Sequence, residues 1–175
     1  FLLDLAPFEL FDLEMARMVS GDPRAGNLLD WLLHNTTMLR CDDVRHFHFW
    51  PQFRAFLLWE MEKECSEEKR RAVFSRGALY YELKEDYAHA LECYTKSGDH
   101  AKISELLIRN SEQHPGMGHY SEMEKYYRAL PESEILASPS LMQGMSMLCA
   151  LAMDYEGSER WYGALKDFAD CRKKQ

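Results

Sequence analysis

Residues 74–94 read FSRGALYYELKEDYAHALECY, and this stretch decides the fold. Large, small and aromatic residues recur in it at the spacing of a tetratricopeptide helix pair. The positions that follow this spacing are Phe74, Gly77, Ala78, Tyr81, Tyr87, Ala90 and Tyr94. Small side chains let two antiparallel helices approach closely, and the aromatic side chains fill the space on either side. The stretch therefore predicts two packed helices.

The sequence after this stretch keeps a weaker helical periodicity. Apolar residues recur at helical spacing over residues 101–130 and again over residues 139–168. The breaks between helices fall at residues 96–99, at residues 114–118, after Pro131 and at residues 154–157. We therefore predict tetratricopeptide-like helical repeats over residues 65–175, as at the start of a sensor superhelix.

The sequence before this stretch has a different pattern. Asp12 is a plausible N-cap for a helix that ends at Gly21, and Pro51 can open another helix. Between these helices, residues 36–41 and 46–50 are β-prone and flank a turn signal at Asp42 and Asp43, which predicts a β-hairpin. Helices followed by a hairpin and a further helix are typical of a winged-helix unit, here over residues 1–64. The predicted fold class is mainly α, with a winged-helix unit and one hairpin followed by α-α superhelical repeats.

Composition and charge exclude several classes of function. The formal net charge of −8 argues against nucleic-acid binding by this segment, since phosphate binding needs a concentrated basic surface. No apolar run is long enough to span a membrane. The five cysteines are widely spaced without a C-x-x-C pair, which favours a reducing cytoplasm. The chain starts at Phe1 without an initiator Met, and we expect it to be an interior piece of a longer protein.

Catalytic motifs are absent from the sequence. It contains no nucleophile elbow and no phosphate-binding loop, so we predict that this segment is not an enzyme and holds no cofactor. Two histidine pairs invite a metal reading: His46 with His48, and His114 with His119. Neither pair has the third and fourth ligands that a metal site needs, and a solvent-facing strand explains His46 and His48 better.

One helical stripe is a candidate surface for an effector or partner. Phe74, Tyr80, Tyr81, Tyr87 and Tyr94 could form a ligand cage, but helix packing explains all of them except Tyr80, which is left without a role. The stripe consists instead of residues that the packing motif does not use, at three- and four-residue spacing on the first helix of the motif: Ser75, Leu79 and Glu82. An ordinary solvated helix face is the alternative explanation. Solenoid proteins bind through their concave surface, which keeps the binding interpretation open.

The order of these elements resembles one family of regulators. The segments that carry the resemblance are Phe1–Leu3, Met38–Arg40 with Asp42 and Asp43, Trp50–Leu57, Tyr87–Tyr94, Ser97–Asp99, Arg128–Pro131 and Ser138–Leu141. The chain is similar in these segments to the middle of the LuxR-family large ATP-binding transcriptional regulators, the MalT-like signal-transduction ATPases. The resemblance covers nearly the whole chain. It implies a winged-helix arm followed by a superhelical effector sensor.

The resemblance also implies what lies outside this segment. ATP or ADP is expected on an N-terminal module, and DNA is expected to bind only through a C-terminal helix-turn-helix. The implied partners are a small-molecule effector or a regulatory protein, with self-association in the full-length protein and no membrane. The family usually has His before the proline that opens the helix after the hairpin, where it reaches nucleotide phosphates. This sequence has Trp50 there, and an indole offers one N–H donor and no charge.

Two other functions remain open from the sequence. A tetratricopeptide-type scaffold for protein–protein interaction would show the same helical pattern without any transcriptional role. A metalloenzyme domain that uses histidines ranks last, because ligand spacing is missing. A phosphate-binding loop upstream and a helix-turn-helix downstream would distinguish the regulator from the scaffold.

Overall fold

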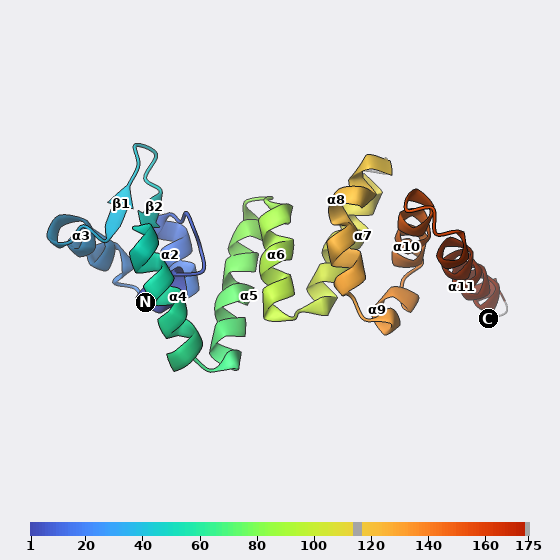
Figure 1. The fold of residues 1–175 in the computed structure, drawn as a ribbon, viewed down its shortest axis with the longest axis horizontal. Helices are drawn as coiled ribbons and strands as arrows, with labels where there is room; N and C mark the ends of the chain where they lie inside the picture. The colour runs from blue at the N-terminus through green and yellow to red at the C-terminus, as the bar shows by residue number, and fades with distance from the viewer. Residues whose placement is uncertain (114–116, 174–175) are drawn as a thin grey trace. The chain divides into compact units, whose positions relative to one another are not determined.

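The computed structural model describes residues 1–113 and 117–173. Over these residues the chain is helical apart from one two-stranded antiparallel sheet (Figure 1). It divides into two compact units, Phe1–Gly98 and Asp99–Gln175. The predicted fold class, helices with a single hairpin followed by helices only, is confirmed. The predicted domain boundary at residues 64 and 65 lies inside the first unit. A division into compact units does not test a boundary between sequence domains, so this boundary stays a prediction.

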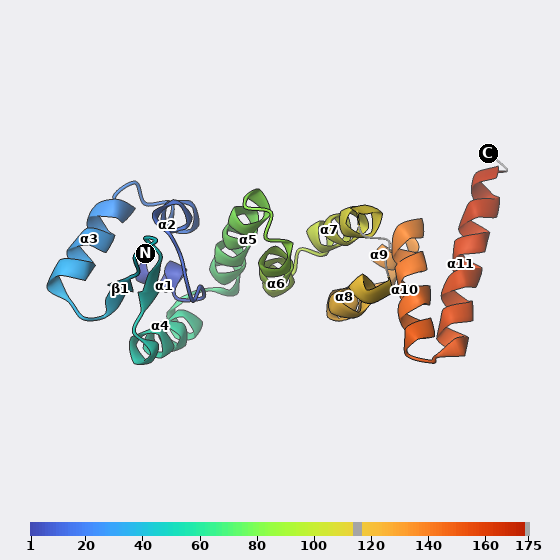
Figure 2. The same cartoon turned by 90° about the horizontal axis from the view of Figure 1, so that it is seen from above.

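The first unit holds the hairpin and the helices around it. Its elements are α1 (Leu2–Leu5), α2 (Leu13–Ser20), α3 (Ala25–Asn35), β1 (Leu39–Cys41), β2 (Phe47–Phe49), α4 (Pro51–Glu64), α5 (Glu67–Leu83) and α6 (Tyr87–Ser97). Helices α5 and α6, called here the first helical pair, lie side by side (Figure 2).

Capping residues set the ends of these helices as the sequence predicts. The Asp12 carboxylate accepts the N–H of Met15 at 2.7 Å and caps α2. Gly21 ends that helix in the left-handed region at φ 67°, which glycine adopts without steric cost. Pro51 stands in the first turn of α4, and the Ser66 hydroxyl accepts the N–H of Lys69 at 3.3 Å at the start of α5. Local side-chain chemistry accounts for these boundaries.

The hairpin is shorter than the sequence predicts. Strand β1 pairs antiparallel with β2, with Leu39 opposite Phe49. The Asp42 carboxylate accepts the N–H groups of Val44 and His46 at 2.9 and 2.8 Å, and these bonds form the tip of the hairpin. Strand β1 ends at Cys41 as predicted but begins only at Leu39, and β2 is one residue shorter at each end than the predicted 46–50. Phe11 adds an isolated bridge to the buried Phe47, which the sequence pattern does not reveal.

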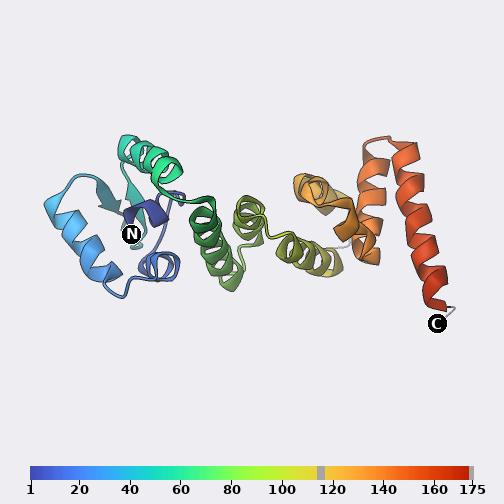
Figure 3. The same ribbon diagram turned by 90° about the horizontal axis from the view of Figure 1, so that it is seen from below.

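The second unit consists of helices over its described residues. They are α7 (His100–Gln113), α8 (Met117–Ala129), α9 (Glu132–Leu136), α10 (Pro139–Leu151) and α11 (Tyr155–Lys173). Helices α10 and α11 lie side by side as a pair (Figure 3). The short helix α9 replaces the turn expected after Pro131. Its buried Ile135 anchors it in the unit.

Candidate functional site

The first helical pair packs against the segment between α1 and α2. Phe8 in this segment is 3% exposed, and a Cβ atom at Gly77 of α5 would overlap the Phe8 ring. The missing side chain of Gly77 therefore makes room for Phe8. The sequence motif places Gly77 where α5 and α6 touch; the structure shows that the close approach is to Phe8 instead. Ala78, next to it, is fully buried.

We call the contact of residues 4–15 with α5 the joint. Polar interactions reinforce it. The Tyr80 hydroxyl donates to Asp12 Oδ2 at 2.8 Å, while Asp12 Oδ1 caps α2. The Lys84 ammonium lies 2.7 Å from the Glu14 carboxylate. Tyr80, the aromatic residue without a role in the helix-packing motif, thus connects α5 to the N-terminus of α2. A single carboxylate serves both the cap and the joint.

Arg54 of α4 fixes the other end of the same segment. Its guanidinium donates from Nε to the carbonyl of Ala6 and from Nη2 to the carbonyl of Pro7, each at 3.0 Å. These carbonyls lie at the C-terminal end of α1 and would otherwise need water. The segment that carries Phe8 is therefore held from α4 as well as from α5.

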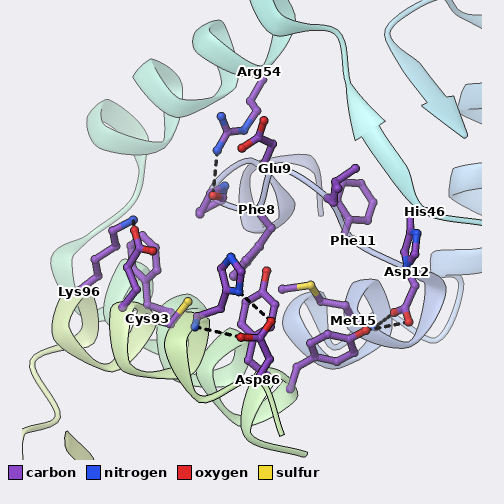
Figure 4. A pocket seen from close by; sticks show the side chains of 17 residues that line it. Phe8, Glu9, Phe11, Asp12, Met15, His46, Arg54, Asp86, Cys93 and Lys96 are labelled. Atoms are coloured by element: carbon purple, nitrogen blue, oxygen red, sulfur yellow. Dashed lines mark hydrogen bonds and ion pairs between the residues drawn. The ribbon is translucent and has the colours of Figure 1, made fainter. Parts of the chain in front are cut away.

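A cleft of about 440 Å³ lies along the joint (Figure 4). One wall comes from the segment Pro7–Asp12 and the start of α2, and the opposite wall comes from α5 and α6. From the first wall the Phe8 ring reaches Gly77 of α5. Figure 4 shows Cys93 and Lys96 on α6, which belongs to the opposite wall. The cleft lies wholly inside the first compact unit.

The α5–α6 wall of the cleft is aromatic and carries paired charges. The His89 ring stacks on Tyr81 with 5.0 Å between ring centroids, and its Nδ1 lies 2.7 Å from the Asp86 carboxylate. The Lys96 ammonium is 3.1 Å from the Glu92 carboxylate and lies 5.5 Å from the centroid of the Phe74 ring. Three aromatic residues line the cleft together: Phe74, Tyr80 and Tyr81. The sequence motif assigns Phe74 and Tyr81 to helix packing and leaves Tyr80 without a role.

Burial and negative neighbours shift the ionisation of groups in this wall. Burial, together with the nearby Cys93 and Asp86, raises the pKa of Tyr81 to about 12. Burial also raises the pKa of the Cys93 thiol to about 12, against the opposing effect of Lys96. Asp86, the N-cap of α6, and His89 and Cys93 within α6 follow one another in the order of an acid, a base and a nucleophile. A thiol with so high a pKa is neutral at physiological pH and a poor nucleophile.

The predicted stripe lies on α5 outside this cleft. Leu79 is 44% exposed, Ser75 is half-buried, and the Glu82 carboxylate accepts the Tyr94 hydroxyl at 2.8 Å. Leu83, which the sequence pattern did not single out, is 63% exposed one turn from Leu79. The role of Ser75, Leu79 and Glu82 in binding stays a prediction.

The histidines raised by the sequence are placed as follows. His46 Nδ1 lies 3.4 Å from the Asp42 carboxylate at the hairpin tip, and His48 pairs across the sheet with Arg40. His114 lies outside the described residues. Within residues 1–113 and 117–173, no three His, Cys, Asp or Glu side chains come together in a way that could hold a metal ion. No helix in those same ranges is long and apolar enough to cross a bilayer.

Trp50 precedes α4 at the position where the resemblance expects histidine. The Arg40 guanidinium lies 4.3 Å from the centroid of its ring, a cation–π contact between the hairpin and the start of α4. Its indole therefore contacts a cation of this chain. The resemblance implies a nucleotide contact made by histidine here, and we do not assign that contact to Trp50, because an indole has one N–H donor and no charge.

Comparison with known protein families found a similarity in the N-terminal part. Residues 1–69 match the family model of the MalT winged helix domain. The match runs from α1 through the hairpin and α4 to the first residues of α5, so most of the first helical pair lies outside it. Neither the curated proteins nor the solved structures gave a match to the chain. The region that matches this family model thus shares one compact unit with a helical pair beyond the end of the match.

The residues that the sequence missed are those of the first wall. Phe8, Glu9 and Asp12 lie in a short irregular segment without periodicity, and they meet α5 and α6 only through the fold. Their one sequence signal is Asp12 as a helix cap, which predicts its bond to Met15 and not its bond to Tyr80.

Proposed function

We propose that this chain is an interior part of a LuxR-type, MalT-like transcriptional regulator. The match of residues 1–69 to the MalT winged helix domain carries the proposal. Further support comes from the helical pairs that follow it, in the order that such a sensor superhelix requires. ATP dependence and effector sensing belong to the full-length protein in this proposal.

The mechanical part of the proposal concerns the joint. A winged-helix arm that belongs to one compact unit with the first helical pair would pass a displacement of the helices directly to the arm. Three contacts would transmit this displacement: Phe8 with Gly77, Tyr80 with Asp12, and Lys84 with Glu14. An effector would drive this change only if it binds the active and inactive states with different affinities.

DNA binding is assigned to another part of the regulator. In helix-turn-helix proteins the second helix of the motif lies in the major groove, and α3, which follows α2 here, carries Asp30 and neither lysine nor arginine. At the hairpin tip, hydrogen bonds from the backbone N–H groups of His46 and Val44 hold the pKa of Asp42 below its usual value. Both features place negative charge where a winged helix would need positive charge.

The full-length protein tests this function. We expect it to bind its operator in a mobility-shift assay only with ATP and effector present, and we expect the 175-residue chain to bind neither duplex DNA nor ATP. A full-length protein that binds no DNA under any ligand condition would refute the assignment. Salt-sensitive DNA binding by the 175-residue chain would contradict the placement of DNA binding elsewhere.

The predicted effector stripe has its own test in the same regulator. Changing Ser75, Leu79 and Glu82 each to Ala should shift the effector dose response of a transcription reporter. Glu68→Ala, in the exposed first turn of α5, is the matched control and should leave it unchanged. An unaltered dose response in all three stripe variants would exclude the stripe as a contact surface.

A protein-interaction scaffold is the second candidate function. The exposure of Leu79 and Leu83, one helical turn apart on α5, favours it, because adjacent exposed leucines are typical of protein contacts. A scaffold would keep its partner in the absence of ATP and would activate no reporter. Reporter activation by the full-length protein therefore separates the two candidates.

A further inference from the structure

The cleft at the joint has the size and walls of a small-molecule site. Its volume of about 440 Å³ falls within the usual range for ligand clefts, about 300–1,000 Å³. Phe8, Phe74 and Tyr81 give it apolar and aromatic surface. The Tyr81 hydroxyl has no hydrogen-bond partner among the residues that the structure describes, so it is available to a ligand.

The charges around the cleft are unbalanced toward negative. Its lining carries four carboxylates, Glu9, Asp12, Asp86 and Glu92, against two permanent cations, Arg54 and Lys96. Arg54 is engaged by two backbone carbonyls and Lys96 by Glu92. Carboxylates on an open surface would attract only hydrated counter-ions, but here they surround an aromatic cleft.

Glu9 is the carboxylate that the fold leaves available. Asp12 is engaged by Met15 and Tyr80, and Asp86 by His89. The exposed Glu9 side chain forms no ion pair within the described part of the chain. A cation in the cleft could therefore pair with Glu9 without breaking a contact that holds the fold.

The aromatic wall is also suited to a positive charge. The ammonium of Lys96 already lies over the Phe74 ring, which shows that this face accommodates a cation. Burial is the main cause of the raised pKa values of Tyr81 and Cys93, and the carboxylates of Asp86 and Glu92 raise both further.

We propose that this cleft binds a small organic cation, an ammonium or guanidinium group on a short chain, with Glu9 as its counter-ion and Tyr81 as its hydroxyl partner. The cation would lie between the Pro7–Asp12 segment and α6 and so bridge the two walls of the joint. The proposal concerns binding alone and holds whether or not the regulatory assignment is correct.

Agmatine, which carries both cationic groups, is the probe for this site. In a titration of the 175-residue chain followed by amide NMR, agmatine should cause saturable shifts in residues 8–12 and in α6. Glutarate, an anion of similar length, should not. Saturable binding of glutarate at these residues, or no saturable shift with agmatine through the millimolar range, would overturn the proposal.

Two variants of opposite sign decide whether charge in the cleft is responsible. Glu9→Gln should weaken agmatine binding about tenfold, whereas Lys96→Gln should strengthen it about two- to threefold, because it removes a competing cation from the cleft. Glu68→Gln, on the exposed first turn of α5 outside the cleft, should have no effect. Equal affinities for agmatine in the wild type and in the Glu9 and Lys96 variants would contradict the proposal. The amide spectra of the variants also report whether the fold is intact.

Discussion

The same packing device occurs in both units, with a different origin for the aromatic ring. In the second unit, a Cβ atom at Gly144 of α10 would lie 2.6 Å from the ring of Tyr127, which belongs to α8. In the first unit, Gly77 of α5 takes the Phe8 ring, which comes from the irregular segment before α2. For the first helical pair, the winged helix thus occupies the place that a preceding helix has in the second unit.

The difference between the two contacts shows what a repeat motif specifies. The motif in residues 74–94 specifies how α5 and α6 pack on each other. It does not specify what packs against the glycine from outside, which is a helix in one unit and an irregular segment in the other. The joint in the first unit adds the hydrogen bond from Tyr80 to Asp12 and the ion pair of Lys84 with Glu14.

The largest effect should come from removing the aromatic ring. Phe8→Ala should lower the free energy of unfolding of the first unit by about 3–5 kcal/mol, since it leaves a cavity beside Gly77. Phe56→Ala, at a residue that is 51% exposed on α4, is the matched control and should change it by about 0.5 kcal/mol or less. Urea denaturation followed by circular dichroism measures both. If the two variants were equally stable, Phe8 would not hold the joint.

The next effect concerns the residue beside the glycine. Ala78 is fully buried, so Ala78→Leu should overpack the interface of α5 and destabilise the unit by about 1–3 kcal/mol. Ala72→Leu on the exposed face of the same helix should be tolerated. An unchanged denaturation midpoint in Ala78→Leu would mean that this packing interface is incorrect.

The polar link of the joint should contribute less. Tyr80→Phe keeps the ring and removes the hydroxyl that donates to Asp12, which should cost about 1–2 kcal/mol because the acceptor is charged. Tyr162→Phe, on an exposed tyrosine of α11, serves as the control. A loss in Tyr80→Phe no larger than in the control would show that the bond adds nothing to the joint.

The smallest effects test the comparison of the two glycines itself. Gly77→Ala and Gly144→Ala should each destabilise their own unit by about 1 kcal/mol, because the clash outweighs the gain in helix propensity. Gly163→Ala in α11, where nothing lies within 4 Å of the added Cβ, should stabilise by about 0.5–1 kcal/mol. If all three substitutions stabilised the protein, Gly77 and Gly144 would not be positions of close packing, and the comparison of the two units would fail.

Local signals predicted most of the fold. Asp12, Gly21, Pro51 and Ser66 act on backbone groups within four residues, so their helix boundaries can be read from the sequence. The helices α1 and α9 are too short to show a periodicity, and the bridge of Phe11 to Phe47 joins distant segments. The two short helices and the bridge therefore could not be predicted from the sequence.

The candidate site was predicted less well than the fold. The cleft depends on contacts such as Tyr80 with Asp12, which are 68 residues apart in the chain. The sequence identified Phe74 and Tyr81 as a possible aromatic cage but favoured packing, because the opposite wall, with Phe8 and Glu9, has no motif. The stripe of Ser75, Leu79 and Glu82 lies on the same helix as that cage and remains to be tested.

Native-state hydrogen exchange of the 175-residue chain tests the central claim, that the winged helix and the first helical pair form one cooperative body. The slowest amides of α2 and of α5 should share one opening free energy. Tyr80→Phe should lower both by the same amount, because it weakens the contact that joins them. Opening of α5 and α6 at a lower free energy than α2, with α2 unaffected by Tyr80→Phe, would contradict the claim.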